Sequence, residues 1–473
     1  MKRPRSEKIT GLALFVIALS VPALALAQSR PPEPQPRDAT ASGERIRATL
    51  PDPVADALVT EAIRRNPDVV RALESAEAAR QRISPARTLP DPFLSFNYQN
   101  DGTSFSLGDQ DMTFLGAMFS QPLPWPGKLR LAGEEAAQRA EEVRASLVGR
   151  TQLSIEASVR RAYTDYLLAR DLLDLIEDRS RAWREISAIV RERYAVGLGV
   201  QQDVLRSQIE VLRLDEARAD QTAQVAARQA EVNRLLARPQ DAEVPASAHL
   251  EFHEQIPDLP DLLTMVRDRS PEIAGIERSI EAGRARVSLA RKDFLPDFVA
   301  SGGPMYRGGL DPMWQVGLGI TLPVYAGSRQ RPRLAAAQAD LRAEGSRASS
   351  AALELEFRTR ERVENLRAAI KVARLYRDGV LPVDQLSLES AVASYRTGKV
   401  PFVTVLDALT TLYIDRAVYL ARLSNANKWR FAIDEAGLEP TGGMAAGASP
   451  STSMSAAPSA ASAGGAMGTS GMR

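Results

Sequence analysis

The chain has 473 residues, of which 25% are charged, and its 60 basic residues nearly balance its 59 acidic ones. This balance argues against a nucleic-acid partner, which would require a basic stripe. With no cysteine and only two histidines, the sequence offers no disulfide, zinc–thiolate site, iron–sulfur cluster or Ser-His-Asp triad. We therefore expect no enzymatic activity, no cofactor and no resident metal.

Residues 1–27 have the features of a cleaved export signal. Basic residues from Lys2 to Lys8 precede an apolar run that ends in Ala25-Leu26-Ala27, so cleavage before Gln28 is expected. A membrane anchor is the alternative, but Gly11, Ser20 and Pro22 interrupt the run. No later stretch approaches the ~20 apolar residues of a membrane helix. The sequence thus predicts an exported chain that can enter a membrane only through β-strands.

The body of the chain is a duplicated helix–strand–strand–helix unit. Four landmarks recur in the same order at offsets of 204, 206, 200 and 201 residues, and a fixed period of this kind indicates a repeat. The matched segments are Asn66-Pro67-Asp68 with Ser270-Pro271-Glu272, Leu89-Pro90-Asp91 with Leu295-Pro296-Asp297, Gly127 with Gly327, and Tyr194, Gly197 and Val204-Leu205 with Tyr395, Gly398 and Val405-Leu406. The predicted organisation is a signal peptide (1–27), a Pro-rich linker (28–50), a first repeat (51–240), a linker (241–258), a second repeat (259–438) and a disordered tail (439–473).

In the first repeat, a helical pattern over Asp68–Thr88 stops at two prolines and is followed by strands over Phe93–Gln99 and Asp111–Gln121. A helix of about 68 residues, ~100 Å long, is then expected from Gly127 to Ala195. Its heptad seam indicates side-by-side helix packing and comprises Ile155, Val159, Ala162, Tyr166, Ala169, Leu173, Ile176, Ser180, Trp183, Ser187, Val190 and Tyr194. The helix at Asp68–Thr88 and another at Gln201–Arg238 are long enough together to pair along this seam.

The second repeat has a matching seam that begins at Val363, Leu366, Ile370 and Ala373. Pro382, which has no amide donor, is expected to kink or restart its long helix. The strand pattern is clearest in this repeat, where apolar residues alternate with polar or small ones over a length that can cross a bilayer. The predicted lipid-facing residues are Trp314, Val316, Leu318 and Ile320. A half-buried strand of a soluble sheet is the alternative, but no further strands are expected to complete such a sheet.

Two strands per repeat give four per chain, and these cannot close a membrane barrel, which needs at least ~8 strands. Open strand edges in lipid are too costly to persist, so several chains must share one barrel. Two copies would give a barrel filled by side chains, whereas three would enclose a lumen. The small and polar residues Gly317, Gly319 and Thr321 suit a lumen, and we therefore favour a homotrimer.

These features together resemble the TolC family of outer-membrane efflux factors over about residues 50–437. The resemblance implies a mainly α fold with a β-barrel contribution: four transmembrane strands per chain, a trimer that closes a twelve-stranded barrel, and long coiled-coil helices that form a periplasmic tunnel. It also implies a periplasmic adaptor and an inner-membrane RND-type pump as partners, and a location in the outer membrane extending into the periplasm. The strand ends Leu89-Pro90-Asp91-Pro92 and Pro124-Trp125-Pro126-Gly127-Lys128-Leu129 look most like the subgroup of heavy-metal pumps of the Cus and Czc type. The lipid-modified cysteine of some relatives is absent.

The resemblance places the functional residues at the two helix turns. In the family, acidic residues and a tyrosine close the inner end of the tunnel, and the matching positions here are Asp203, Asp407 and Tyr395. Thr404 and Val400 depart from members that carry an acid and an arginine there. Each Asp could instead be a cap or a solvated side chain, and Tyr395 could simply pack in the seam. Adaptor docking is implied at the first turn by Val196, Gly197 and Leu198; the second turn keeps only Gly398 of this motif.

The sequence contains two weaker candidate metal-binding patterns and leaves two alternative functions open. His249 and His253 are spaced i, i+4 with Glu251 between them, but a surface linker is the favoured interpretation over a metal pair. Methionines in the tail could bind Cu(I), although incidental methionines in a disordered tail are favoured. A drug-efflux or type I secretion duct of the same fold is one alternative to heavy-metal export. A periplasmic coiled-coil scaffold that never enters a membrane is the other.

Overall fold

The computed structural model describes residues 52–438 except for residues 104, 108–110 and 247–248. All of these belong to one compact unit, Ile46–Arg473. The predicted signal peptide, Pro-rich linker and tail lie outside the described residues. No described helix is both long and apolar enough to cross a membrane.

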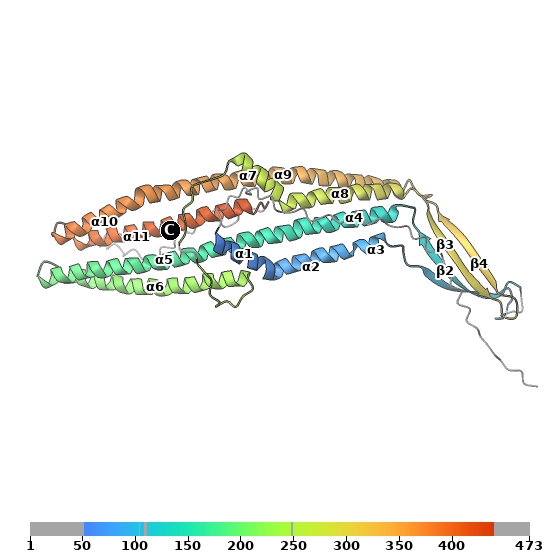
Figure 1. Cartoon of the computed structure of the whole chain (residues 1–473), viewed down its shortest axis with the longest axis horizontal. Coiled ribbons are helices and arrows are strands. Elements are labelled where there is room, and N and C mark those ends of the chain that lie inside the picture. Colours follow the sequence, from blue (N-terminus) through green and yellow to red (C-terminus); the bar gives the residue numbers. More distant parts are fainter. Residues whose placement is uncertain (1–51, 104, 108–110, 247–248, 439–473) are drawn as a thin grey trace, which may run out of the picture. The chain divides into compact units, whose positions relative to one another are not determined.

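Each half of the described chain runs in the order helices, two strands, long helix, turn, helix (Figure 1). The elements of the first half are α1 (Pro53–Arg65), α2 (Pro67–Gln81), α3 (Ile83–Arg87), β1 (Phe93–Gln99), β2 (Phe114–Leu123), α4 (Lys128–Val143), the π-helical turn η1 (Arg144–Val148), α5 (Gly149–Ala195) and α6 (Gln201–Leu235). Those of the second half are α7 (Leu259–Arg269), α8 (Pro271–Lys292), β3 (Asp297–Tyr306), β4 (Met313–Thr321), α9 (Gln330–Leu375), the π-helical turn η2 (Tyr376–Val380), α10 (Leu381–Arg396) and α11 (Phe402–Asp434).

The long helix of the first repeat is continuous. Helical backbone angles persist through η1, so α4, η1 and α5 run without a break from Lys128 to Ala195, close to the predicted span. In the second repeat helical backbone angles also persist from α9 through η2 into α10, and Pro382 lies in the first turn of α10. The π-helical turn η2 changes the hydrogen-bond pattern next to this residue, which has no amide donor. The helix does not restart as a separate element, and a kink at Pro382 stays a prediction.

The shorter helices pair along the long ones, as the sequence predicted. Near the strands the neighbours run in the order α2 and α3, α4, α8, α9; toward the turns they run α6, α5, α11, α10. Most of the predicted seam on α5 is buried, including Val159, Trp183 and Val190, each 0% exposed. Tyr194, at the end of the seam, is exposed.

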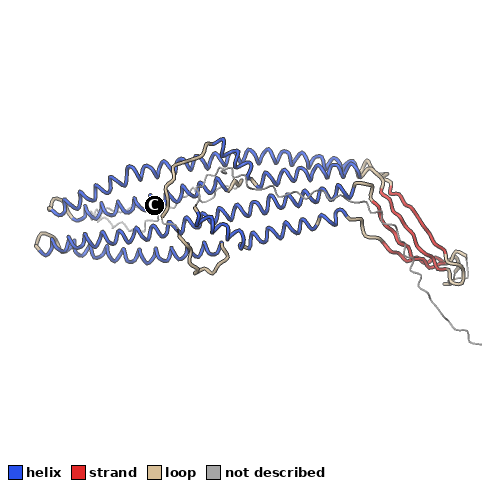
Figure 2. Tube along the Cα trace, viewed as in Figure 1, coloured by secondary structure: helices blue, strands red, loops and turns tan. Residues whose placement is uncertain are grey.

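The four strands form one antiparallel sheet in the order β1-β2-β3-β4. Phe96 pairs with Ala117, Gly116 with Met305, and Gly302 with Val316. A Cβ on Gly303 would lie only 1.8 Å from the carbonyl oxygen of Ala117, so the close approach of β3 to β2 requires glycine there. The sheet lies at one end of the helices and the two interhelical turns lie at the other (Figure 2).

The sequence-based elements need corrections in both repeats. Each repeat begins with a helix that was not predicted, α1 in the first and α7 in the second. Asp52, the N-cap of α1, accepts hydrogen bonds from the amides of Val54 and Ala55 and precedes a proline at the first helical position. The second strand begins at Phe114 rather than Asp111 and continues to Leu123. The first strand has the predicted bounds.

Candidate functional site

The two helix turns share one backbone geometry. Gly197 and Gly398 both have φ +76°, a left-handed conformation that glycine adopts without strain. After Gly197, the amide of Leu198 donates to the carbonyl of Arg193 (2.8 Å); after Gly398, the amide of Lys399 donates to the carbonyl of Ser394 (2.9 Å). Each long helix therefore ends in a Schellman motif. This motif explains why the glycine of the Tyr-x-x-Gly pattern recurs in the sequence.

Tyr395, at the end of α10, is buried and packs in a hydrophobic cluster. It is 4% exposed, and its ring lies 5.7 Å from that of Phe402, which in turn contacts Trp183 edge-on. Burial and the nearby Asp203 carboxylate raise the pKa of the Tyr395 hydroxyl, and Arg193 partly offsets them. The hydroxyl is buried and makes no hydrogen bond of normal geometry with any described residue. The packing role considered for Tyr395 is thus present in the structure.

Arg193 joins the two turns, and the sequence analysis missed it. Its guanidinium donates to the carbonyls of Tyr395 (2.5 Å) and Arg396 (2.7 Å) and to that of Leu198 in its own turn (3.0 Å). It also lies over the Tyr395 ring, 4.8 Å from the centroid. A basic residue in the last turn of a helix is a known C-terminal signal, but its contact with the other repeat depends on packing that one sequence does not reveal.

The predicted gate residues do not form one cluster within a single chain. Asp203 lies in the first turn of α6, half-buried and near Tyr395. Asp407 and Thr404 are exposed on α11, and within the described part of the chain their side chains make no hydrogen bond or ion pair. Of the predicted docking residues, Val196 and Leu198 are 64% and 70% exposed, so the first turn presents an apolar tip.

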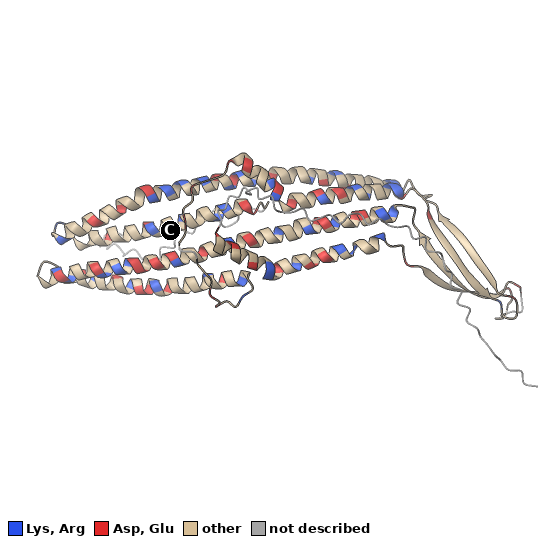
Figure 3. Ribbon diagram, viewed as in Figure 1, with Lys and Arg blue, Asp and Glu red and all other residues tan. Residues whose placement is uncertain are grey.

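The predicted lipid-facing side chains all lie on β4 and are exposed: Trp314, Val316, Leu318 and Ile320. Polar and small residues on the other face of β4 are not buried either. A half-buried strand of a soluble sheet would have one covered face, and β4 has none within the described residues. The strands contain a single charged residue, Asp297, in contrast to the helices (Figure 3).

A salt-bridge cluster lies where the strands meet the helices. Lys128, at the start of α4, is almost buried, and its ammonium contacts the carboxylates of Asp297 (2.9 Å) and Asp293 (3.7 Å). Asp297 also accepts a hydrogen bond from the amide of Trp125, whose ring stacks on Phe298. This cluster joins the Pro-Trp-Pro-Gly-Lys segment of the first repeat to the Leu-Pro-Asp segment of the second.

The two histidines do not form a pair. Both lie in the segment between α6 and α7, outside any helix, as the favoured linker interpretation requires. His249 Nδ1 lies 2.9 Å from Asp171 Oδ1 on α5, whereas His253 Nε2 lies 3.3 Å from Glu251 Oε2.

The sequence matches the family described as "Outer membrane efflux protein" over residues 58–238 and 262–429. These two stretches correspond to the two repeats and cover more than half of the chain.

Individual relatives are distant in sequence. The cobalt-zinc-cadmium resistance protein CzcC of Cupriavidus metallidurans is 24% identical over 365 residues, which cover 76% of this chain and 84% of CzcC. The alkaline protease secretion protein AprF of Pseudomonas aeruginosa is 27% identical over 296 residues, covering 56% of this chain and 60% of AprF. A solved structure of CusC has the same fold, with a TM-score of 0.67, 17% identity and coverage of 81% of this chain and 92% of that one.

Proposed function

Because the chain belongs to the outer membrane efflux protein family, it is a channel component of the outer membrane that extends into the periplasm, and not an enzyme. From this premise we propose that three copies form one duct. The duct would work with a periplasmic adaptor and an inner-membrane RND-type pump, and its cargo would be heavy-metal cations.

The open edges of the four-stranded sheet are the observation that supports the trimer. β1 and β4 each pair on one side only within the described chain, so both edges present unpaired backbone groups. Lipid cannot satisfy such groups, and β1 of one copy next to β4 of another would satisfy both edges. Three copies give a closed ring that can enclose a lumen.

The turns supply the proposed gate and docking site. Three copies would bring Asp203 and Asp407 to one opening, where confined carboxylates attract cations. Thr404 would replace an acid in this ring, and Tyr395 would hold the helices of one copy together. Val196, Gly197 and Leu198 would receive the adaptor; the second turn, with Gly398 but no apolar tip, would dock it less well.

Two relatives point to different cargoes. CzcC is a cobalt-zinc-cadmium resistance protein, which supports metal export, whereas AprF is a secretion protein. Deleting the gene in its native host and measuring growth with cobalt, zinc or cadmium, with a panel of drugs and with a secreted-protease assay separates these cargoes. If the deletion strain were sensitive to drugs alone, or lost secretion alone, the cargo would be a drug or a secreted protein rather than a metal cation.

Cysteine cross-linking tests the shared barrel, since the chain contains no cysteine of its own. β1 and β4 are opposite edges of the sheet, so a short bifunctional reagent acting on F96C with V316C should join different copies and yield covalent trimers. The pair F96C with A117C is the control, because these positions face each other within one chain and should give only monomers. Cross-linked dimers without trimers, or a protein recovered from the soluble periplasm, would contradict the proposal.

A further inference from the structure

Asp171, on α5, is a buried carboxylate that contacts no arginine or lysine among the residues that the structure describes. Its side chain is 7% exposed, and His249 is its only ion-pair partner among the described residues. Its second oxygen accepts a hydrogen bond from the amide of Leu250 (3.1 Å). Burying a carboxylate is costly unless hydrogen bonds or an opposite charge compensate it. The Leu250 amide and the His249 ring provide these contacts here, and a bound cation could supply a full positive charge.

A second carboxylate completes a three-ligand arrangement. Asp174 lies one helical turn after Asp171, on the same face of α5. One oxygen of each Asp and one ring nitrogen of His249 all lie within 4.8 Å of one another. Asp174 and His249 are exposed on the solvent side of the cluster, which leaves room for an ion to enter and for water to complete its coordination.

The linker that carries His249 is held in place by contacts outside the cluster. Asn233 donates to the carbonyls of Gln240 and Ala242, and Arg430 donates to those of His253 and Gln255. Leu250, the residue after His249, is buried in the core beside α5. The imidazole is therefore positioned by the fold rather than presented on a free loop.

We propose that Asp171, Asp174 and His249 form a binding site for one divalent transition cation of the zinc class. One imidazole with two carboxylates and an open position suits Zn²⁺ or Co²⁺, whereas Mg²⁺ and Ca²⁺ prefer oxygen ligands alone. Nδ1 of His249 would bind the ion and release its proton to water, so affinity should fall at low pH. The Leu250 amide would keep its bond to Asp171 and orient the carboxylate.

The ligand separations bracket those that an ion needs. At metal–ligand distances of ~2.0–2.1 Å, tetrahedral ligand atoms lie ~3.3 Å apart. His249 Nδ1 and Asp171 Oδ1 are now 2.9 Å apart and would exchange their hydrogen bond for the ion, while the three ligand atoms lie within 4.8 Å of one another. A bound ion would attach the segment between α6 and α7 to the middle of α5. This inference does not depend on metal being the cargo.

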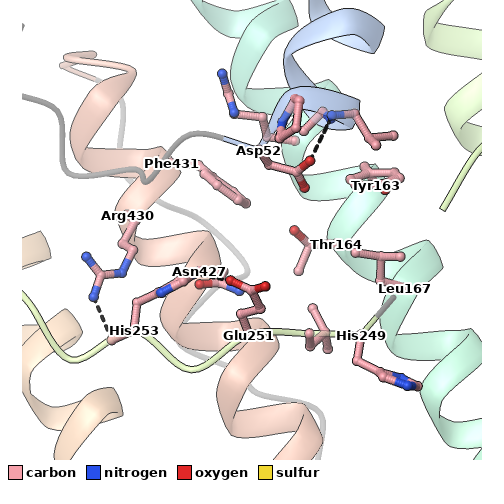
Figure 4. A pocket seen from close by; sticks show the side chains of 15 residues that line it. Asp52, Tyr163, Thr164, Leu167, His249, Glu251, His253, Asn427, Arg430 and Phe431 are labelled. Carbon is pink, nitrogen blue, oxygen red and sulfur yellow. Dashed lines mark hydrogen bonds and ion pairs between the residues drawn. The ribbon is translucent and has the colours of Figure 1, made fainter. Parts of the chain in front are cut away.

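The two histidines border one cavity from different directions. This cavity of about 220 Å³ lies between α1, α5, α11 and the linker and is lined by His249, Glu251 and His253. Figure 4 shows that the imidazole of His249 points away from its interior and from His253. His253 contacts Glu251, whereas His249 contacts Asp171 of the proposed site. The two histidines thus serve as a matched pair for a test: one inside the proposed site, one in the same linker outside it.

Calorimetric titration with ZnCl₂ at pH 7.5 tests the proposal on detergent-purified full-length protein prepared without a histidine tag. We expect one saturable site per chain and, with Co²⁺, visible absorption bands of a nitrogen- and oxygen-ligated ion. Loss of an outer partner of a metal ligand weakens binding by about 10–100-fold, so His249→Gln and Asp174→Asn should each weaken zinc binding at least as much. His253→Gln should bind as the wild type does.

Asp203→Asn with Asp407→Asn serves as a second control, because it removes the acids of the proposed gate and should leave this site intact. Loss of zinc binding in that variant would move the ion to the gate and overturn the proposal. Three further results would overturn the proposal: unchanged zinc affinity in His249→Gln, loss of zinc affinity in His253→Gln, or no saturable zinc site in the wild type.

Discussion

Arg193→Met should loosen the connection between the two turns. The guanidinium makes three hydrogen bonds to backbone carbonyls, two of them in the other repeat, and a cation–π contact with Tyr395. Hydrogen bonds to a charged group contribute about 1.5–3 kcal/mol each, and an exposed cation–π contact ~0.5–1 kcal/mol. Water can reach these carbonyls once the side chain is gone, so we expect a net loss of about 2–4 kcal/mol rather than the full sum.

A loss of 3 kcal/mol corresponds to a factor of roughly 100 or more in an opening equilibrium. In planar-bilayer recordings, Arg193→Met should therefore raise the open fraction of the channel, and hydrogen exchange should accelerate at the amides of Leu198 and Lys399. Arg193→Lys should be intermediate, because an ammonium keeps the charge but lacks the planar fork that spans several carbonyls.

Arg191 supplies the control. It lies two residues earlier on α5, and within residues 52–438 as described its side chain donates only to the carbonyl of Ser187 in its own helix. Arg191→Met should therefore change neither conductance nor exchange at the turns. If Arg193→Met also leaves both unchanged while the trimer remains intact, the contacts of Arg193 do not hold the turns together, and the reasoning from its hydrogen bonds fails.

Three further predictions address the gate, the sheet and the effect of pH. Asp203→Ala with Asp407→Ala should relieve block by divalent cations from the periplasmic side and lower cation selectivity without loss of the trimer; unchanged block in bilayer recordings would place the constriction elsewhere. Gly303→Ala should abolish membrane assembly because its Cβ would collide with Ala117, whereas Gly319→Ala, with its nearest neighbour at 3.7 Å, should yield normal amounts of heat-modifiable oligomer. Burial and the facing carboxylate of Asp415 raise the pKa of Asp384, so the ionised form is disfavoured in the folded state. The thermal midpoint of Asp384→Asn should exceed that of the wild type at pH 7, and the difference should vanish as the pH falls through the raised pKa.

The repeated architecture could be predicted from the sequence because its signals are periodic. The seam on α5, the alternation on β4 and the recurring Tyr-x-x-Gly pattern each depend on one local rule: heptad packing, period-two alternation, and a left-handed C-terminal cap. α1 was missed although Asp52-Pro53 is a helix-start signal, because the prediction began at the stronger repeat landmark, Asn66-Pro67-Asp68. The second strand begins at Phe114 rather than at Asp111, and no sequence signal of comparable strength marks this start.

The contacts between repeats could not be predicted, because they depend on which helices become neighbours. Arg193 reaches α10 only because α5 lies beside α11 and α11 beside α10. The position equivalent to Arg193 in the second repeat is Ser394, whose short side chain could not span to the first turn. Duplication therefore explains the shared backbone of the two turns but not the connection between them. One turn donates the guanidinium and the other supplies two of the three carbonyls, so the two repeats are alike in fold and unequal in the contacts that they make. The proposed gate would therefore contain two kinds of turn, joined by a side chain that α5 supplies.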